Sequence, residues 1–427
     1  MPRTRNKKKG GRRSADVSED ETFDDRVSVA SSKLSDHDSL PQLEDGDEGS
    51  DDVVEAGDEF EDKLKEFIDG TSQKSAKGRL TCLEGIRSSL SRRYIYEFIY
   101  ERKITIADCI ERCLKKGKSE EQSLAAVNSI LLCCQLGAGE ESEAIFNSFR
   151  PILTTIIQDK NASAKSRASC STALGLSCFI ASGDMLAVKE IMSVLELVFK
   201  ASYLKGDGSS PSHSPNESAI HTSALSAWTL LLSISPITHV QSLISSHLPK
   251  ILELLRSEDV NLRIAAGEAI ALFYELAREQ DELFVGEDID SLKITLKELA
   301  TDSNKYRAKK DRRQQRSSFR DILRTVEDND YPYELIKFGM EAVELDSWVK
   351  KRQYGALRDV LGAGMNLHLR DNDLLREIFG LGASLSLAEC KAMKLSKFER
   401  HAYNSAAFKA RTLSRGKQRD TKQVAAY

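Results

Sequence analysis

The sequence predicts a mainly α-helical protein, in which a HEAT/armadillo-like α-solenoid is followed by a small, mostly helical C-terminal domain and a terminal basic helix. Two observations predict the solenoid. A polar lead-in with an arginine, followed by a dense Ala/Leu/Ile stretch, recurs along the chain, and apolar residues from position 59 follow a 3.6-residue period. The motif is clearest at Ala76–Ile86, Ala164–Leu176 and Val260–Leu272.

The spacing of this motif identifies the type of repeat. Its arginine position falls at residues 79, 123, 167, 223, 263 and 307, in steps of 44, 44, 56, 40 and 44. The long step contains residues 206–215, whose Gly, Ser and Pro content predicts a loop insertion. A period of about 40–47 residues is typical of HEAT and armadillo repeats, which usually form binding surfaces. We therefore expect a scaffold.

Residues 1–58 are expected to be a disordered acidic tail. Between Asp16 and Asp62 there are 19 acidic and 2 basic residues, and such a segment buries too little apolar area to offset the entropy of ordering. Ser18 and Ser35 are each followed by acidic residues and are candidate phosphorylation sites. A solvated tail without regulation is the alternative.

Residues 59–316 are expected to form the helical repeats, with Gly137, Gly183 and Pro236 between helices. Seven of the eight cysteines lie in apolar helical segments, and none belongs to a CxxC pair. They are interpreted as reduced core thiols, and neither a metal nor another cofactor is expected.

No enzyme motif is present: the chain has no Walker A loop, GxGxxG, HExxH or GxSxG. We interpret His213, His221, His239 and His247 as surface or helix-end residues, so neither catalysis nor a small-molecule substrate is expected. The N-terminus is polar and the longest apolar run is too short to span a bilayer. We therefore expect no membrane contact, and a location in cytoplasm and nucleus.

Residues 317–396 are expected to form the C-terminal domain. Alternating apolar residues at Leu335–Gly339 and Ala342–Asp346 predict a small hairpin that turns near Gly339. Helices are expected to resume at Trp348, interrupted by glycines.

A first basic element, residues 301–324, keeps the repeat register while cations replace its apolar face. Nine cations stand against three acids, so a helix here would present a positive ridge to phosphates. A solvated helix or a nuclear localisation signal at 309–316 are the alternatives. The cations of the ridge are Lys305, Arg307, Lys309, Lys310, Arg312, Arg313, Arg316, Arg320 and Arg324.

A second basic element occupies residues 397–427. On a helix, Lys397, Arg400, Arg411 and Arg415 share one face, whereas alanines and Leu413 fall opposite. Tyr403 and Phe408 offer rings on which unpaired bases could stack. The alternative is a helix docked on the solenoid by its Ala/Leu face. The candidate RNA-binding residues are Lys397, Arg400, Tyr403, Phe408, Lys409, Arg411, Arg415, Lys417 and Arg419.

Four stretches together resemble the interferon-related developmental regulator family: Ile110–Lys118, Val260–Glu268, Ala300–Lys309 and Tyr403–Thr412. The resemblance runs from about residue 59 to 420. It implies an armadillo-type domain followed by a family-specific C-terminal domain. It also implies one of two roles: occupation of idle ribosomes with repression of translation, or transcriptional co-regulation with deacetylase complexes.

In the ribosomal role, the resemblance implies that the protein sits where tRNAs bind and that its C-terminal helix, here about 397–415, enters the mRNA path. Leu413, Gly416 and residues 424–427 interrupt the more uniformly basic end expected of the family. The partners expected in this role are rRNA, ribosomal proteins and tRNA. The alternative role uses the solenoid groove for deacetylase or transcription-factor partners, and the basic clusters for nuclear import.

Overall fold

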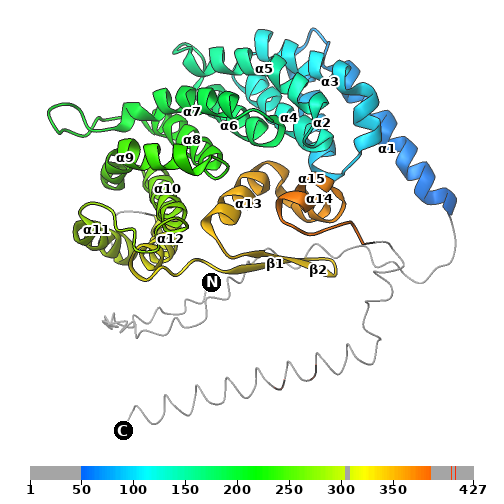
Figure 1. Cartoon of the computed structure of the whole chain (residues 1–427). Helices are drawn as coiled ribbons and strands as arrows, with labels where there is room; N and C mark the ends of the chain where they lie inside the picture. Colours follow the sequence, from blue (N-terminus) through cyan, green and yellow to red (C-terminus); the bar gives the residue numbers. More distant parts are fainter. Residues whose placement is uncertain (1–49, 303–307, 386–404, 406–408, 410–427) are drawn as a thin grey trace, which may run out of the picture. The chain divides into compact units, whose positions relative to one another are not determined.

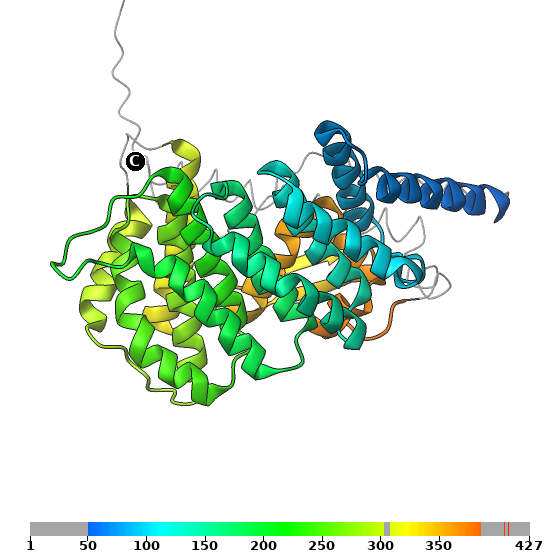
Figure 2. The ribbon, with the colours of Figure 1, turned by 90° about the horizontal axis from the view of Figure 1, so that it is seen from above.

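The computed structural model describes residues 50–302, 308–385, 405 and 409. Residues 56–302 and 308–385 belong to one compact unit. Within this unit, paired helices are stacked side by side, as the repeat spacing predicts (Figures 1 and 2). The mainly helical, HEAT/armadillo-like fold class is therefore confirmed for the described solenoid.

The second helix of each pair contacts the corresponding helix of the next pair. In four pairs it begins three residues before the predicted motif position, at 79, 123, 167 and 263, whereas the predicted position 223 lies eight residues inside its helix and 307 lies before the helix that starts at Lys309. We call these second helices the inner helices. They are α2 (Ala76–Arg92), α4 (Glu120–Leu136), α6 (Ala164–Ala181), α8 (Pro215–Leu232), α10 (Val260–Arg278) and α12 (Lys309–Asp328).

The outer helices alternate with them along the chain, and the 206–215 insertion is a loop before α8, as expected. The outer helices are α1 (Ser50–Gly70), α3 (Tyr96–Lys116), α5 (Glu140–Gln158), α7 (Met185–Phe199), α9 (Ile237–Glu253) and α11 (Ile289–Thr301), with short 3₁₀ turns at Lys200–Ser202 and Leu254–Arg256.

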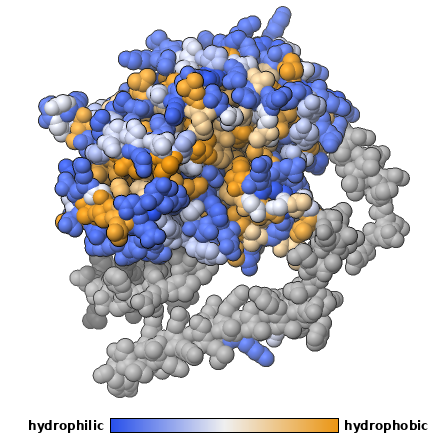
Figure 3. Space-filling view, viewed as in Figure 1, coloured by the Kyte–Doolittle hydropathy of each residue, from blue (hydrophilic) through white to orange (hydrophobic). Residues whose placement is uncertain are grey.

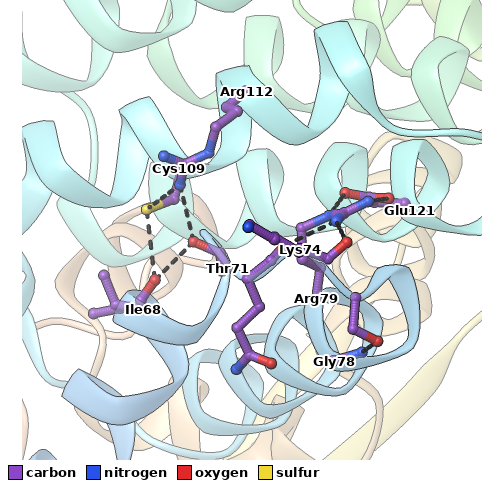
Figure 4. A network of polar contacts seen from close by, with 10 residues as sticks. Ile68, Thr71, Lys74, Gly78, Arg79, Cys109, Arg112 and Glu121 are labelled. Carbon is purple, nitrogen blue, oxygen red and sulfur yellow. Dashed lines mark hydrogen bonds and ion pairs between the residues drawn. The ribbon is translucent and has the colours of Figure 1, made fainter.

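In α2, α6 and α10 the arginine of the motif ties the helix to backbone carbonyls of the preceding segment. Figure 4 shows Arg79 of α2 beside Glu121 of α4, with Nε 2.6 Å from Oε1 and Nη2 3.0 Å from Oε2. The same guanidinium donates to the carbonyls of Gln73 and Lys74 in the preceding turn. In α10 the buried Arg263 likewise donates to Glu258 O and to Gln315 of α12. The arginine recurs because one planar group can satisfy both neighbours.

Small residues of the motif let inner helices approach closely. A Cβ on Gly175 of α6 would lie 2.6 Å from the Cβ of Ala227 on α8, and one on Gly267 of α10 would lie 2.9 Å from the ring of Phe319 on α12. Buried amides add specific links, since Asn128 of α4 donates to the carbonyl of Leu83 on α2 at 3.0 Å. The inner helices are therefore held in a fixed register.

The cysteines of the described helices are free and buried, as expected for seven of the eight; Cys390 lies outside the described residues. Burial raises the pKa of Cys133 to about 11 and that of Cys170 to about 12. Thiols with such pKa values remain protonated and pack as small apolar groups.

After α12 the chain forms the expected hairpin. Strands β1 (Glu334–Phe338) and β2 (Glu341–Leu345) pair antiparallel, and Gly339 at the turn has a φ of 56°. The φ is positive, a conformation that glycine adopts without steric cost. The following helices are α13 (Trp348–Leu361), α14 (Met365–Asp371) and α15 (Asp373–Ile378), with a 3₁₀ turn at Gly362–Gly364.

These C-terminal helices do not stand apart from the repeats. Helix α13 contacts α2, α4, α8 and α10, and α14 contacts α2, so the segment lies along the inner helices (Figure 1). Helix α12 runs across position 316/317, where the sequence suggested a boundary, because its apolar residues pack on α10 and α11. In the structure the solenoid continues to Asp328.

Polar contacts fix the C-terminal helices at both ends of this inner surface. Glu275 of α10 accepts hydrogen bonds from the backbone N–H of Trp348, at 2.6 Å, and of Val349, at 3.2 Å. At the other end, Nε2 of the buried His368 lies 3.1 Å from Leu90 O at the end of α2. Glu275 thus caps the start of α13 across more than seventy residues of sequence.

We expect Glu275 to make stability depend on pH. Burial raises the pKa of its carboxyl from the ordinary 4.5 to about 7, against the opposing effect of the two backbone N–H groups. The folded protein therefore binds more protons than the unfolded chain between those pH values, and the free energy of unfolding falls by up to about 3 kcal/mol as pH rises through that window. Urea titrations of Glu275→Gln should show a flatter pH profile.

Glu282→Gln is the matched control, because Glu282 is exposed and is not among the charges that raise the pKa of Glu275; this variant should keep the profile of the unmodified protein. Equal pH slopes for Glu275→Gln and the unmodified protein would contradict this assignment.

The interpretation of all four histidines as surface or helix-end residues is wrong for two of them. His221 and His247 are 7% and 6% exposed, because α8 and α9 pack against α7 and α10. Nδ1 of His221 lies 2.7 Å from Ser202 Oγ, and burial lowers its pKa to about 4. His247 lies 3.5 Å from Glu196 and packs beside the Trp228 ring. Both are core histidines with polar partners.

Candidate nucleic-acid interface

Helix α12 is amphipathic, and its buried face corrects one expectation. Cations do not replace the apolar face of this repeat: Phe319, Ile322 and Val326 are at most 1% exposed and pack into the core. Gln315 is buried on the same side and accepts the hydrogen bond from Arg263. The cations lie on the other faces of the helix. The count of charges along the sequence did not separate these faces from the apolar one.

The cations of α12 form a ridge along its solvent side. At 100° per residue, Lys309, Arg313, Arg316, Arg320 and Arg324 fall within one face, and the sixteen positions they span cover roughly 22 Å of helix. Lys309, Lys310, Arg313, Arg320 and Arg324 are exposed, while Arg312 and Arg316 are half-buried.

Most of these charges are not neutralised by neighbours. Lys309, Lys310, Arg313 and Arg316 form no ion pair with another described residue. Arg324 differs, since it lies 2.8 Å from Asp321 and 3.5 Å from Asp330. The N-terminal half of α12 therefore presents the strongest positive charge on this helix.

Several predicted site residues lie outside the described part of the chain. These are Lys305 and Arg307 of the ridge, the phosphorylation candidates Ser18 and Ser35, and all but Lys409 of the terminal set. Lys409 is helical and exposed. The predictions for Lys397, Arg400, Tyr403, Phe408, Arg411, Arg415, Lys417 and Arg419 stay predictions.

The inner surface holds a cavity of about 470 Å³ between α8, α10, α13 and the hairpin. Its lining includes three basic residues, Lys351, Arg352 and Arg358, and three acidic ones. This balance gives the cavity no preference for phosphate. On the side of the molecule seen in Figure 1, hydrophobic residues gather toward the middle and hydrophilic residues lie along the upper rim (Figure 3). Of the inner surface and the α12 ridge, the ridge is therefore the one with an excess of positive charge.

A metal site or a membrane-spanning helix would point to other functions. Within residues 50–302, 308–385, 405 and 409, no cluster of three His, Cys, Asp or Glu side chains could hold a metal ion. No described helix has the length and apolar content to cross a membrane.

Sequence reasoning missed Arg376, which is 2% exposed. It stands in Asp373–Phe379, where four of the seven residues are apolar, and an arginine within so short and largely apolar a segment is the signal that could have identified a buried ion pair. It also missed Glu275 and Trp348, whose contacts join distant parts of the chain.

Comparison with known proteins places this arrangement in a family. The model of the interferon-related developmental regulator family matches residues 26–327, and that of the interferon-related protein conserved region matches residues 372–423. The first match ends within α12, and the second contains α15 and residues 397–423 of the terminal basic segment.

Similar proteins include interferon-related developmental regulator 1 of Sus scrofa, 51% identical over 364 residues, and of Homo sapiens, 50% identical over 364 residues. Each alignment covers 85% of this chain and 81% of the relative. Interferon-related developmental regulator 2 of Mus musculus is 49% identical over 366 residues, covering 84% of this chain and 82% of the relative.

Among solved structures, a designed armadillo repeat protein is 12% identical and aligns with 61% of this chain and 99% of its own, at a TM-score of 0.38. An engineered protein is 14% identical and aligns with 61% of this chain and 97% of its own, at 0.37. The matched family model spans most of the solenoid, and the relatives cover more than four fifths of the chain; the chain belongs to the interferon-related developmental regulator family.

Proposed function

We propose that this protein is a non-enzymatic, ribosome-binding repressor of translation. It occupies inactive ribosomes, where the solenoid blocks tRNA sites and the C-terminal basic segment blocks the mRNA channel. Inhibition is steric exclusion and requires no chemistry. The partners are rRNA phosphates, ribosomal proteins and tRNA.

The observation that carries the proposal is the unpaired cationic half of α12. Lys309, Lys310, Arg313 and Arg316 lie at the end of a rigid helical array and form no ion pair with another described residue. Such a row suits the regularly spaced charges of an RNA backbone. The second basic element adds 10 cations against 2 acids from Lys391 to Tyr427.

The alternative role, a nuclear co-regulator that holds protein partners in the solenoid groove, has less support. Helices α13 and α14 lie along the inner helices where such a partner would dock. A partner of that kind would have to displace contacts such as Glu275 with Trp348, or bind elsewhere.

Backbone-dominated RNA binding should weaken steeply with salt. If about five phosphates are neutralised, the logarithm of the association constant should fall against the logarithm of salt concentration with a slope of about −3.5 to −4.5. Fluorescence titration of purified ribosomes at several KCl concentrations measures this slope. A slope near zero would contradict recognition through the cationic ridge and favour a groove-bound protein partner.

Co-sedimentation with purified ribosomes tests the proposal directly. The intact chain should travel with monosomes that lack mRNA, and a variant ending at Cys390 should not. If neither chain binds ribosomes, the proposal that the protein represses translation by blocking ribosomal sites is wrong, and the nuclear co-regulator role becomes the favoured one. If the truncated chain binds as well as the intact one, the terminal segment is not the channel plug.

A further inference from the structure

One buried arginine holds the last described turn of the chain. Arg376 of α15 donates from Nε to Gly382 O at 2.8 Å, and from Nη2 to Leu381 O at 3.1 Å and Ala383 O at 2.8 Å. Three consecutive carbonyls therefore converge on a single guanidinium. Residues 386–404, which lead into the basic segment, follow directly.

The same guanidinium also contacts α14 and β2. Its Nη1 donates to the carbonyls of Leu369 and Arg370 at the end of α14, at 3.1 and 3.2 Å. A bidentate pair with Glu341 of β2 completes the set, at 2.7 and 3.1 Å. The hairpin, α14 and the chain after α15 are thus tied to one planar group.

The environment makes this arrangement rigid. The Arg376 side chain is 2% exposed and that of Glu341 is 18% exposed. Breaking this ion pair would therefore leave a buried charge without a partner, which costs free energy. Gly380 and Gly382 have φ values of 65° and 71°, the left-handed conformation that lets the chain turn around the guanidinium.

We propose that Arg376 is a positioning residue for ribosome binding: it sets the point and direction in which the basic C-terminal segment leaves the solenoid body. This inference rests on the proposed function. Two linked binding elements reinforce each other only when the geometry of the link allows both to bind at once. Fixing the exit lets the segment and the α12 ridge engage one RNA surface together.

The test combines Arg376→Gln with a ten-residue Gly-Ser linker inserted after Ser384. Arg376→Gln is expected to lower ribosome affinity at least tenfold and to speed amide hydrogen exchange at residues 380–385, while exchange in α2–α10 stays unchanged. The linker alone should lower affinity to a similar extent. Added to the linker, Arg376→Gln should cause no further loss, because the exit is already uncoupled.

Arg358→Gln is the matched control, since it removes one exposed arginine charge from the neighbouring helix α13, outside the contacts of Arg376, and should leave affinity within twofold. Two results would overturn the inference: an affinity loss for Arg376→Gln that persists in full on the linker background, or faster exchange with unchanged affinity. If the unmodified protein does not bind ribosomes while the exchange change is still seen, the failure lies with the proposed function.

Discussion

Reversal of Arg400, Arg411 and Arg415 to glutamate is expected to abolish ribosome binding while the helical fold persists. On a helix these residues would share one face, and the basic C-terminal segment carries only two acids from Lys391 to Tyr427. Each lost phosphate contact forfeits the release of a counterion, so three losses should lower affinity at least about 100-fold at 0.1 M salt. Co-sedimentation and circular dichroism measure the two outcomes.

The matched control reverses three exposed lysines outside both basic elements: Lys189, Lys205 and Lys250. It changes the net charge by the same amount and should alter affinity only slightly, through long-range repulsion. If the arginine variant still binds ribosomes and its circular dichroism spectrum is unchanged, the proposal that the C-terminal basic segment blocks the mRNA channel is ruled out. Equal losses in both triple variants would mean that net charge, and not this segment, controls binding.

Replacement of Trp348 by alanine is expected to destabilise the protein by about 3–5 kcal/mol, the usual cost of deleting a buried aromatic side chain. Trp348 is 2% exposed, and its indole Nε1 donates to Thr325 Oγ1 of α12 at 2.8 Å. Its loss opens a void between α12 and α13 and leaves Thr325 with one partner fewer. Chemical denaturation measures the free energy of unfolding.

Hydrogen exchange should localise the damage from Trp348→Ala to α13, α14 and α15, because this residue begins the segment that lies on the inner helices. Tyr333→Ala serves as the control: its side chain is 63% exposed and should contribute less than about 0.5 kcal/mol. A Trp348→Ala protein as stable as the Tyr333→Ala protein would show that the docking does not depend on this anchor.

Local features of this fold could be predicted from the sequence. Helices α2, α6 and α10 begin at the repeated motif because the serine or aspartate caps Ser75, Ser163 and Asp259 precede the apolar run, and the arginine binds adjacent carbonyls. The hairpin followed from alternation around Gly339, which has the positive φ that the turn requires.

Contacts between distant segments could not be predicted in the same way. The carboxyl of Glu275 meets Trp348 73 residues later, and His368 meets Leu90 278 residues earlier. No periodicity encodes such pairs, so the C-terminal helices were expected to form a domain beyond the solenoid. For α12, a count of charges did not reveal that the helix also has an apolar face, on which Phe319 and Ile322 are buried.

The position of the C-terminal helices changes how the repeats share stability. In an open array each repeat touches only its neighbours, and unfolding can begin at one end and spread. Here α13 contacts both α2 and α10, and α14 contacts α2, so early and late repeats are cross-linked by a segment that is synthesised after all of them. During synthesis the first repeats therefore reach their full set of contacts only after residues near 370 have been made. In the finished protein, unfolding that starts at α2 or at α10 must break contacts with the same helix, α13.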